Sequence, residues 1–325
     1  METGIIQKEI ENVRTVVKKV YDEYGKVIVG QSGMLERILI ALFSSGHILL
    51  EGVPGLAKTE AVKTIASLCG LDFSRIQFTP DLLPADILGT QIFNMKTGLF
   101  TTKKGPLFSN IILADEINRA PSKVQSALLE AMQERQITIA DTTYPLSEPY
   151  IVLATQNPIE QEGTYPLPEA QVDRFMFKVK VTYPSSADEI EIIKRKTSGE
   201  NTNPAQVLTG DHIARMKKLV EKVYIDERLY GYIIELISAT RNPDKYGLDK
   251  SLISYGASPR ASIYLVKAAK AYALLQGDSY VKTEDIKAVA YDILRHRIIL
   301  SYEAEAESIT TEDILRKIFE TVETP

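Results

Sequence analysis

The sequence has few of the residues on which metal centres, disulfides and membrane spans depend. It contains one cysteine, Cys69, and three histidines in 325 residues. A single cysteine cannot form an intrachain disulfide, which favours a reducing compartment, and we expect Cys69 to be a small buried residue at a helix end. So few cysteines and histidines give no recognisable metal-ligand cluster. No run of 18 apolar residues occurs, so we expect no membrane span.

Basic residues are also fewer than acidic residues. Lysine and arginine total 38 against 43 acidic residues, which gives a formal net charge of −5, and no long basic block is present. A surface that follows a nucleic-acid backbone needs such a block, so nucleic acid is not an expected partner. Residues 1–31 are charged throughout and lack the apolar core of a signal peptide. Together with the cysteine content, this predicts a cytoplasmic protein.

Apolar residues, in contrast, make up 44% of the chain, which is enough for a sizeable core, and the length exceeds one average domain. Up to residue 181, short apolar runs alternate with helical patterns, which predicts a parallel α/β sheet. The expected strands are 47–51, 74–79, 111–115, 151–155 and 175–181. Two helices, 6–24 and 31–44, are expected before them.

Two segments interrupt this alternation, and a helical region follows it. Residues 80–107 are rich in proline and glycine, whereas residues 135–149 alternate like a β-hairpin that turns at 141–143. From residue 184 the pattern is helical throughout, apart from a polar loop at 197–204. The expected helices there are 209–223, 226–241, 259–276, 283–295 and 311–322. We therefore expect two domains, an α/β core at 1–183 and an α-helical domain at 184–325.

A glycine-rich loop follows the first predicted strand. The run Gly52-Val-Pro-Gly-Leu-Ala-Lys58-Thr59 leads directly into a helical pattern. Glycines allow backbone N–H groups to surround phosphate oxygens, while the helix presents its positive end to the same anion. Lys58 would reach the β- and γ-phosphates, and the Thr59 hydroxyl would hold Mg²⁺. Ala57 replaces the usual glycine, which the loop tolerates provided that Ala57 keeps a negative φ. The alternative is a glycine turn without function.

Two acids end the third predicted strand. Asp115 and Glu116 follow the apolar run 111–114, and the carboxyl ends of parallel strands form the ligand crevice of an α/β sheet. Asp115 would bind Mg²⁺, directly or through water, and Glu116 would accept a proton from an attacking water. The alternative is an ordinary pair of acids that caps a helix.

Three further motifs are weaker when taken alone. Asn157 follows the fourth predicted strand and could orient the same water, although an Asn-Pro pair usually marks a turn. Arg174 lies in Asp173-Arg174-Phe175 just before the last predicted strand. Arg260 lies in Ser258-Pro259-Arg260 at the start of a long helical pattern. Isolated arginines are ordinarily surface residues.

In this order, the motifs resemble those of AAA+ ATPases, and three longer stretches resemble the MoxR branch of that family. The stretches are residues 113–121, 125–135 and 154–171. The resemblance covers roughly residues 25 to 300. It implies an α/β fold in which an AAA+ P-loop core with a parallel five-stranded sheet is followed by a smaller all-α lid domain. The segments 80–107 and 135–149 then correspond to the helix-2 insert and to the hairpin before sensor 1.

The resemblance also implies a role for each motif. Lys58 and Thr59 match Walker A, and Asp115 and Glu116 match Walker B, with Thr59 and Asp115 as metal ligands and Glu116 as catalytic base. Asn157 matches sensor 1, Arg260 matches sensor 2, and Arg174 matches an arginine finger that acts on the neighbouring subunit. The segment 29–31 matches the part near adenine. The expected nucleotide-binding residues are Gly30, Gln31, Gly52, Val53, Pro54, Gly55, Leu56, Ala57, Lys58, Thr59, Glu60 and Arg260.

The function implied is Mg²⁺-dependent binding and hydrolysis of ATP by a self-associated ring, with a hexamer expected. The family further implies a chaperone-like remodeller that assists the maturation or assembly of a partner enzyme complex, with a von Willebrand A-type protein as partner and a protein as client. Two alternatives stay open from the sequence. One is a chelatase-like or nucleic-acid motor, and the other is a nucleotide-switched scaffold without appreciable turnover.

Overall fold

The structure, a computed structural model, describes residues 2–158, 163–198 and 203–325. Its contacts divide the chain into two compact units. The core unit comprises residues 18–175 and 179–214, and the helical unit comprises residues 1–17, 176–178 and 215–325. Residues 159–162 of the signature stretch 154–171, and residues 199–202 of the predicted polar loop, lie outside the described residues.

A five-stranded parallel sheet with the order β2-β5-β8-β1-β9 confirms the predicted α/β core. Register pairs Gln77 with Asp115 and Glu51 with Gln156, so these strands end at one edge of the sheet. The strands are β1 (Ile48–Glu51), β2 (Phe73–Gln77), β5 (Ile111–Asp115), β8 (Ile151–Gln156) and β9 (Phe177–Lys180).

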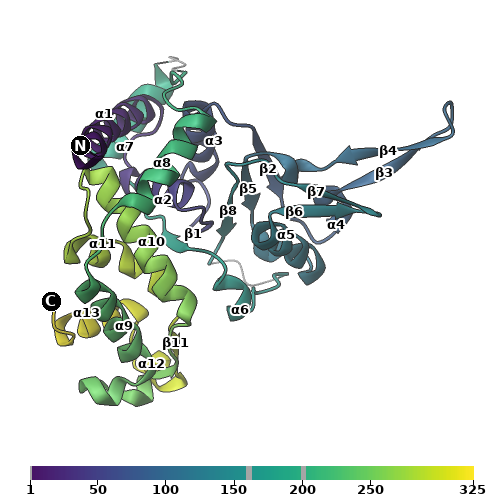
Figure 1. The fold of residues 1–325 in the computed structure, drawn as a ribbon. Helices are drawn as coiled ribbons and strands as arrows, with labels where there is room; N and C mark the ends of the chain where they lie inside the picture. Colours follow the sequence, from purple (N-terminus) through teal and green to yellow (C-terminus); the bar gives the residue numbers. More distant parts are fainter. Residues whose placement is uncertain (1, 159–162, 199–202) are drawn as a thin grey trace. The chain divides into compact units, whose positions relative to one another are not determined.

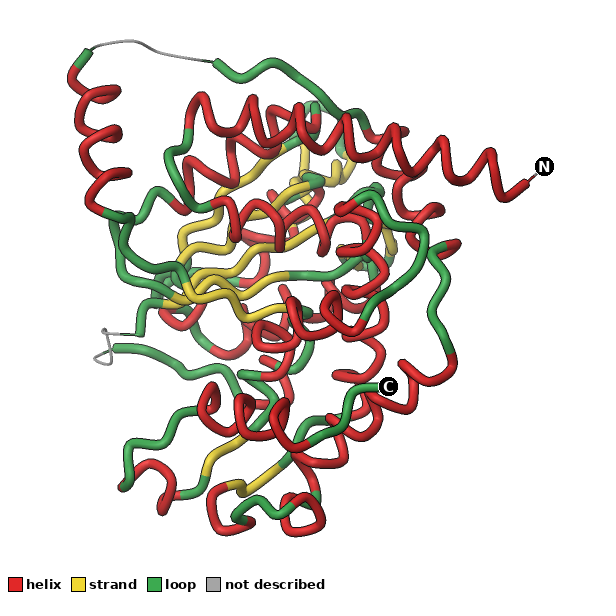
Figure 2. Tube along the Cα trace, turned by 90° about the vertical axis from the view of Figure 1, so that its left-hand side faces the viewer, coloured by secondary structure: helices red, strands yellow, loops and turns green. Residues whose placement is uncertain are grey.

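The central strands β1, β5 and β8 are apolar because both of their faces are buried, as is usual for parallel sheets. Ile112 and Ala114 of β5 pack in one cluster with Leu128 of the helix α5 (Ser122–Glu134). Alternate residues point to the opposite face, and the helix α3 (Lys58–Cys69) contacts β5 and β2. Figure 2 shows the strands flanked by helices.

The helix predicted directly after the glycine-rich loop is α3. α3 ends at Gly70, which takes the left-handed conformation with φ 58°. Cys69, the last residue of α3, is fully buried, so its expected place at a helix end is confirmed. Helices α1 (Glu2–Val27) and α8 (Gly210–Lys222) each have residues in both units. The core unit further contains α2 (Ser32–Phe43), α4 (Pro84–Leu88), α6 (Glu169–Val172) and α7 (Ser186–Thr197).

The proline- and glycine-rich segment forms α4 and then a ribbon of β3 (Gly89–Asn94) and β4 (Leu99–Lys104) that extends away from the sheet (Figure 1). At its base, a Cβ on Gly105 would lie 2.3 Å from the carbonyl oxygen of Ile87, which only glycine avoids. The ribbon exposes large apolar side chains from both of its faces. These are Ile92, Phe93, Met95, Leu99 and Phe100.

The second interruption is the hairpin of β6 (Gln136–Ile139) and β7 (Thr142–Pro145). Its turn was predicted at residues 141–143, which is wrong. Ile139 pairs with Thr142, so Ala140 and Asp141 make the turn. Ala140 takes a φ of 51°, a left-handed conformation that alanine rarely adopts and that the sequence therefore does not signal.

The helical unit confirms the predicted helices to within two residues at each end. Pro259 opens α10 as expected, and Gly277 ends it in the left-handed conformation. Lys282 is the N-cap of α11. We expected only helices in this part of the chain, but it also contains a two-stranded antiparallel pair, β10 (Ile253–Tyr255) with β11 (Ile299–Leu300). The helices are α9 (Glu227–Arg241), α10 (Pro259–Gln276), α11 (Thr283–Leu294), α12 (Tyr302–Ala306) and α13 (Thr311–Thr321). No helix in the described parts of the chain is long and apolar enough to cross a bilayer.

Candidate active site

The glycine-rich loop joins the end of β1 to the start of α3. A Cβ on Gly52 would lie 2.6 Å from the carbonyl oxygen of Val181, so the close passage of the backbone requires glycine there. Gly55 has open space around it but a φ of 85°, so at this position it is the backbone conformation that favours glycine. The loop therefore delivers Lys58 as the first residue of α3.

The expectation for Ala57 is wrong. Ala57 is the N-cap of α3 and has φ 53° and ψ 22°, which is the left-handed conformation and not the negative φ that we expected. Left-handed backbone costs a non-glycine residue about 1–2 kcal/mol. The glycine that such loops usually carry here would avoid this cost. The loop thus stores local strain next to the free N–H groups of the helix.

Lys58 folds back over its own loop. Its Nζ donates a hydrogen bond of 2.6 Å to the carbonyl oxygen of Gly52. Burial lowers the pKa of Lys58, whereas the negative charges of Asp115 and Glu116 act in the opposite direction. The ammonium group therefore contacts its own loop and experiences the negative charge of the two acids.

The loop and the acids line one cavity of about 440 Å³, called here the main cavity. The structure thereby brings most of the predicted site residues together. Those that line the main cavity are Gly52, Pro54, Gly55, Leu56, Ala57, Lys58, Thr59, Glu60, Asp115, Glu116 and Asn157. Arg75 and Thr155, which were not predicted, line it as well.

A second cavity of about 220 Å³, the side cavity, shares Gly55, Leu56, Ala57 and Glu60 with the main cavity. Gln31 lines it, and the Gln31 amide donates a hydrogen bond of 2.7 Å to the carbonyl oxygen of Leu56. Gly30 and Val53 belong to neither lining. The apolar residues of the side cavity are Val27, Ile28, Val29, Leu56, Pro184 and Ile192. The shared wall makes the two cavities adjacent. The main cavity is lined by polar and apolar groups in about equal measure, and the side cavity is largely apolar.

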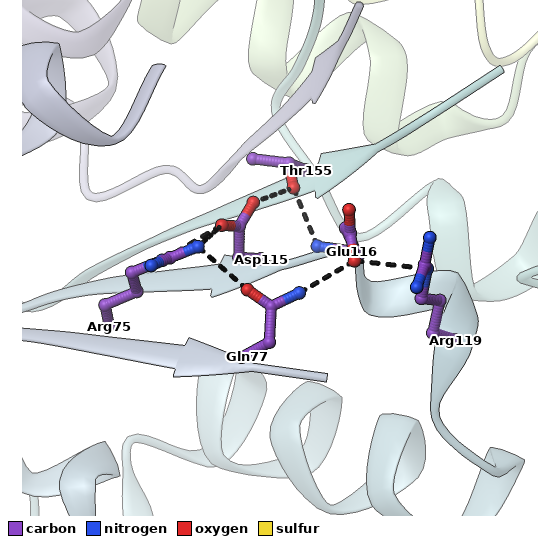
Figure 3. A network of polar contacts seen from close by, with 6 residues as sticks. All are labelled: Arg75, Gln77, Asp115, Glu116, Arg119 and Thr155. Atoms are coloured by element: carbon purple, nitrogen blue, oxygen red, sulfur yellow. Dashed lines mark hydrogen bonds and ion pairs between the residues drawn. The ribbon is translucent and has the colours of Figure 1, made fainter. Parts of the chain in front are cut away.

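The two acids are fixed through Thr155 on the neighbouring strand β8 (Figure 3). The hydroxyl of Thr155 donates to Oδ1 of Asp115 at 2.6 Å and accepts the N–H of Glu116 at 2.7 Å. Glu116 has φ 57° and ψ 50°, again left-handed. The chain therefore turns sharply after β5 and directs the two carboxylates differently.

Each of the two carboxylates also forms an ion pair with an arginine. Asp115 Oδ2 accepts two N–H bonds from Arg75 on β2. Glu116 Oε2 accepts the Gln77 amide at 2.7 Å and pairs with Arg119 Nε at 3.1 Å. Figure 3 shows these residues as one connected network. As found here, both acids are held by protein groups.

Sequence reasoning missed Arg75, Gln77, Thr155 and Arg119. A weak signal was available, because Arg75 and Gln77 alternate on one face of the predicted strand 74–79. Their partners, however, are 39 or 40 residues away, so the contact depends on strand order. No local sequence pattern indicates that β2 pairs with β5.

The remaining predicted site residues are Asn157, Arg174 and Arg260. Asn157 is 9% exposed and lines the main cavity. Arg174 Nη1 donates to the carbonyl oxygen of Leu129 at 3.2 Å, and Arg174 does not line the main cavity of its own chain. Arg260 is the second residue of α10 in the helical unit. The roles assigned to these three residues stay predictions.

The donors present suit Mg²⁺. Thr59 and Asp115 line the main cavity with a hydroxyl and a carboxylate, and Mg²⁺ prefers hard oxygen ligands from one or two side chains together with substrate phosphates. Within residues 2–158, 163–198 and 203–325, no group of three or more His, Cys, Asp or Glu residues could hold a metal by itself. A divalent ion would therefore depend on the anion bound beside it.

Comparison with known proteins agrees with this geometry. Residues 47–177 match the family described as "ATPase family associated with various cellular activities (AAA)", and residues 248–318 match "AAA lid domain". The chaperone MoxR1 of Mycobacterium tuberculosis is 48% identical over 316 residues, which cover 96% of this chain and 83% of the relative. The protein MoxR of Methylorubrum extorquens is 29% identical over an alignment that covers 93% of each chain.

A solved structure is also close to this one. The crystal structure of a candidate ATPase from Cytophaga hutchinsonii superposes with a TM-score of 0.94 at 55% identity and covers 99% of both chains. The matches thus span both the core with its main cavity and the helical segment after it.

Proposed function

The chain belongs to the MoxR family of AAA+ ATPases, and we propose that it binds Mg-ATP and hydrolyses it in the main cavity. One observation carries the proposal. A glycine loop, a lysine and a threonine at a helix N-terminus line the same cavity as two acids at the end of β5. This set supplies what phosphoryl transfer to water needs, namely anion binding, a metal site and a base.

Binding starts from the loop. The N–H groups at the start of α3 and the Lys58 ammonium would hold the β- and γ-phosphates. Lys58 must first leave the carbonyl oxygen of Gly52, and a phosphate offers it a stronger, charge-assisted partner. The side cavity, with its apolar lining, is the proposed place of the adenine, next to Gly30 and Gln31.

Hydrolysis needs a base that can reach a water. We assign this role to Glu116, because it lines the main cavity together with Lys58 and Asp115. Glu116 would accept the proton of the attacking water once Gln77 and Arg119 release its Oε2. Asn157 would orient the same water. A Mg²⁺ ion held by Thr59 and Asp115 would neutralise the charge on the phosphates.

Completion of the site depends on parts beyond the main cavity. We propose that residues 1–183 act as the nucleotide-binding core and residues 184–325 as the lid, with Arg260 directed to the γ-phosphate. Arg174 would act on a neighbouring subunit, which requires a ring, and a hexamer is the expected size. A phosphoryl-transfer site gains about 10³–10⁵ in rate from such an arginine finger.

The physiological role is proposed from the relatives. One of them is named a chaperone, so we propose that ATP turnover drives remodelling of a protein client or assembly of a partner enzyme complex in the cytoplasm. The von Willebrand A-type partner expected from the family belongs to the same proposal. The exposed apolar side chains of the β3–β4 ribbon are a candidate contact for the client.

Two assays test the function directly. Purified protein with ATP and Mg²⁺ should release phosphate, and Lys58→Ala should lose nucleotide binding in a fluorescence titration with a labelled ATP analogue. Tight ATP binding without any phosphate release by the assembled protein would favour the switched scaffold. Absence of ATP binding by folded wild-type protein would overturn the proposal.

A further inference from the structure

Arg75 links the two acids of the main cavity from the neighbouring strand. Its Nε and Nη2 donate to Asp115 Oδ2 at 3.0 and 2.6 Å, and Nη2 also donates to Gln77 Oε1 at 2.8 Å. The other end of the Gln77 amide, Nε2, donates to Glu116 Oε2 at 2.7 Å. One guanidinium group thus contacts Asp115 and at the same time orients the amide that holds Glu116 (Figure 3).

Protein groups occupy both oxygens of Asp115. Oδ1 accepts the hydroxyl of Thr155, and Oδ2 accepts the guanidinium of Arg75. The Asp115 side chain is only 14% exposed, whereas that of Arg75 is 48% exposed. Of these two neighbours, Thr155 is buried and fixed by its strand, and Arg75 is free to swing into solvent. A cation that approaches Asp115 therefore meets Arg75 as the movable competitor.

We propose that Arg75 is a positioning residue that competes with Mg²⁺ for Asp115 and, through Gln77, couples its own departure to the release of Glu116. The inference rests on the proposed function, because it requires Mg-ATP in the main cavity. Arg75 would act as the internal counter-ion of Asp115 until the metal arrives with the nucleotide.

Electrostatic repulsion and hydrogen bonding explain why metal binding would displace Arg75 and release Glu116. Two cations that share one carboxylate oxygen repel each other, so metal at Asp115 weakens the bonds from Arg75. When Arg75 leaves, Gln77 Oε1 loses its donor and the amide can rotate. Glu116 then loses one of the two groups that hold Oε2. Metal occupancy would thereby be transmitted to the base over two hydrogen bonds.

The direct test is the Mg²⁺ dependence of nucleotide binding. A fluorescent ATP analogue is titrated with Mg²⁺ in the presence of wild-type protein and of Arg75→Gln. Without the competitor, the half-saturating Mg²⁺ concentration should fall about fivefold, the order expected of a half-exposed charge-assisted pair. A midpoint that is unchanged or raised in a folded variant overturns the proposal.

A matched control removes the same charge elsewhere. Lys103 is exposed on β4 and does not line the main cavity, so Lys103→Gln should keep the wild-type midpoint. If Arg75→Gln does not fold, as judged by thermal melting, Arg75→Lys is used. That variant keeps the charge but loses the double donation to Asp115, so its midpoint should still fall, by a smaller factor. A wild-type midpoint in Arg75→Lys would then overturn the proposal.

The relay through Gln77 has its own test, a double-mutant cycle on the same Mg²⁺ midpoint. In a Glu116→Gln background, the shift in the Mg²⁺ midpoint caused by Arg75→Gln should change by about twofold or more. The reason is that Arg75 and Glu116 both form hydrogen bonds with the Gln77 amide. In a Gln77→Leu background, the two effects should become additive. Additivity with Gln77 present would refute the relay. Wild-type protein that binds no ATP, in contrast, would contradict the proposed function and not this inference.

Discussion

The hydroxyl of Thr155 donates a hydrogen bond of 2.6 Å to Oδ1 of Asp115, so an uncharged residue of β8 orients the expected metal ligand of β5. The same oxygen accepts the N–H of Glu116 at 2.7 Å, at a residue with left-handed backbone. Thr155 is 1% exposed, so water cannot replace it. This residue therefore supports both the direction of Asp115 and the sharp turn of the chain at Glu116.

Thr155→Val tests this support. Valine keeps the shape but leaves the N–H of Glu116 and Oδ1 of Asp115 without this partner, so unfolding in urea should show a loss of about 1–3 kcal/mol. Thr155→Ser keeps the hydroxyl and should lose clearly less. Equal stability of the valine variant and the wild type would show that the hydroxyl supports neither group.

Glu116→Gln should separate turnover from binding. The amide removes the base but keeps the size of the side chain, so phosphate release should fall by roughly 10²–10⁴-fold. A labelled ATP analogue should still bind, whereas Lys58→Ala should lose affinity because it removes the ammonium of the loop. Wild-type turnover in Glu116→Gln would remove Glu116 from the mechanism.

Ala57→Gly should stabilise the protein despite the usual cost of glycine. The left-handed φ of Ala57 costs about 1–2 kcal/mol, and glycine adds about 0.4–1 kcal/mol of entropy to the unfolded chain. A net gain of between about 0 and 1.6 kcal/mol is expected in urea unfolding. Ala127→Gly within α5 should have the opposite sign, because its backbone is helical. A loss of stability at both positions would argue against strain at Ala57.

Cys69 should react only when the protein unfolds. It is fully buried, and burial raises the pKa of its thiol to about 12. Because the thiolate is the reactive form, a raised pKa means that little of it exists in the folded state below that pH. A thiol reagent at pH 8 should therefore label the chain slowly without urea and quickly in it. Fast labelling of native protein would show that Cys69 is accessible.

The strands and the loop could be predicted because their signals are local. The runs at β1, β5 and β8 are apolar on both faces, and glycines and acids mark the points where they end. Ala57 shows where local reasoning fails. Its positive φ is imposed by the loop and not by its own preference, so an alanine in the sequence suggests the wrong conformation.

The polar network depended on information that a single chain does not display. Arg75 meets Asp115 because β2 pairs with β5, and Thr155 meets Asp115 because β8 pairs with β5 on its other side. The pair β10–β11 was missed for a related reason. Its strands have three and two residues, too few for alternation to be recognised, and the chain between them contains the helices α10 and α11.

Arg174 provides the test of assembly. Its guanidinium donates to the carbonyl oxygen of Leu129 and does not line the main cavity of its own chain, as a residue that serves a neighbour would require. Arg174→Ala should therefore abolish phosphate release, by about 10³–10⁵-fold, while the affinity for a labelled ATP analogue stays near that of the wild type. Urea unfolding of the variant controls for the lost bond to Leu129.

Mixing two inactive variants then distinguishes action on a neighbour from action within one chain. In a ring of Arg174→Ala and Glu116→Gln subunits, some sites combine an intact Glu116 with an intact Arg174 from the adjacent subunit. Phosphate release should partly recover at those sites. Recovery is impossible if both residues serve the same subunit, because every subunit then lacks one of them. A mixture that stays inactive, although light scattering and labelled subunits show mixed rings, would refute the assignment of Arg174 to the neighbouring site.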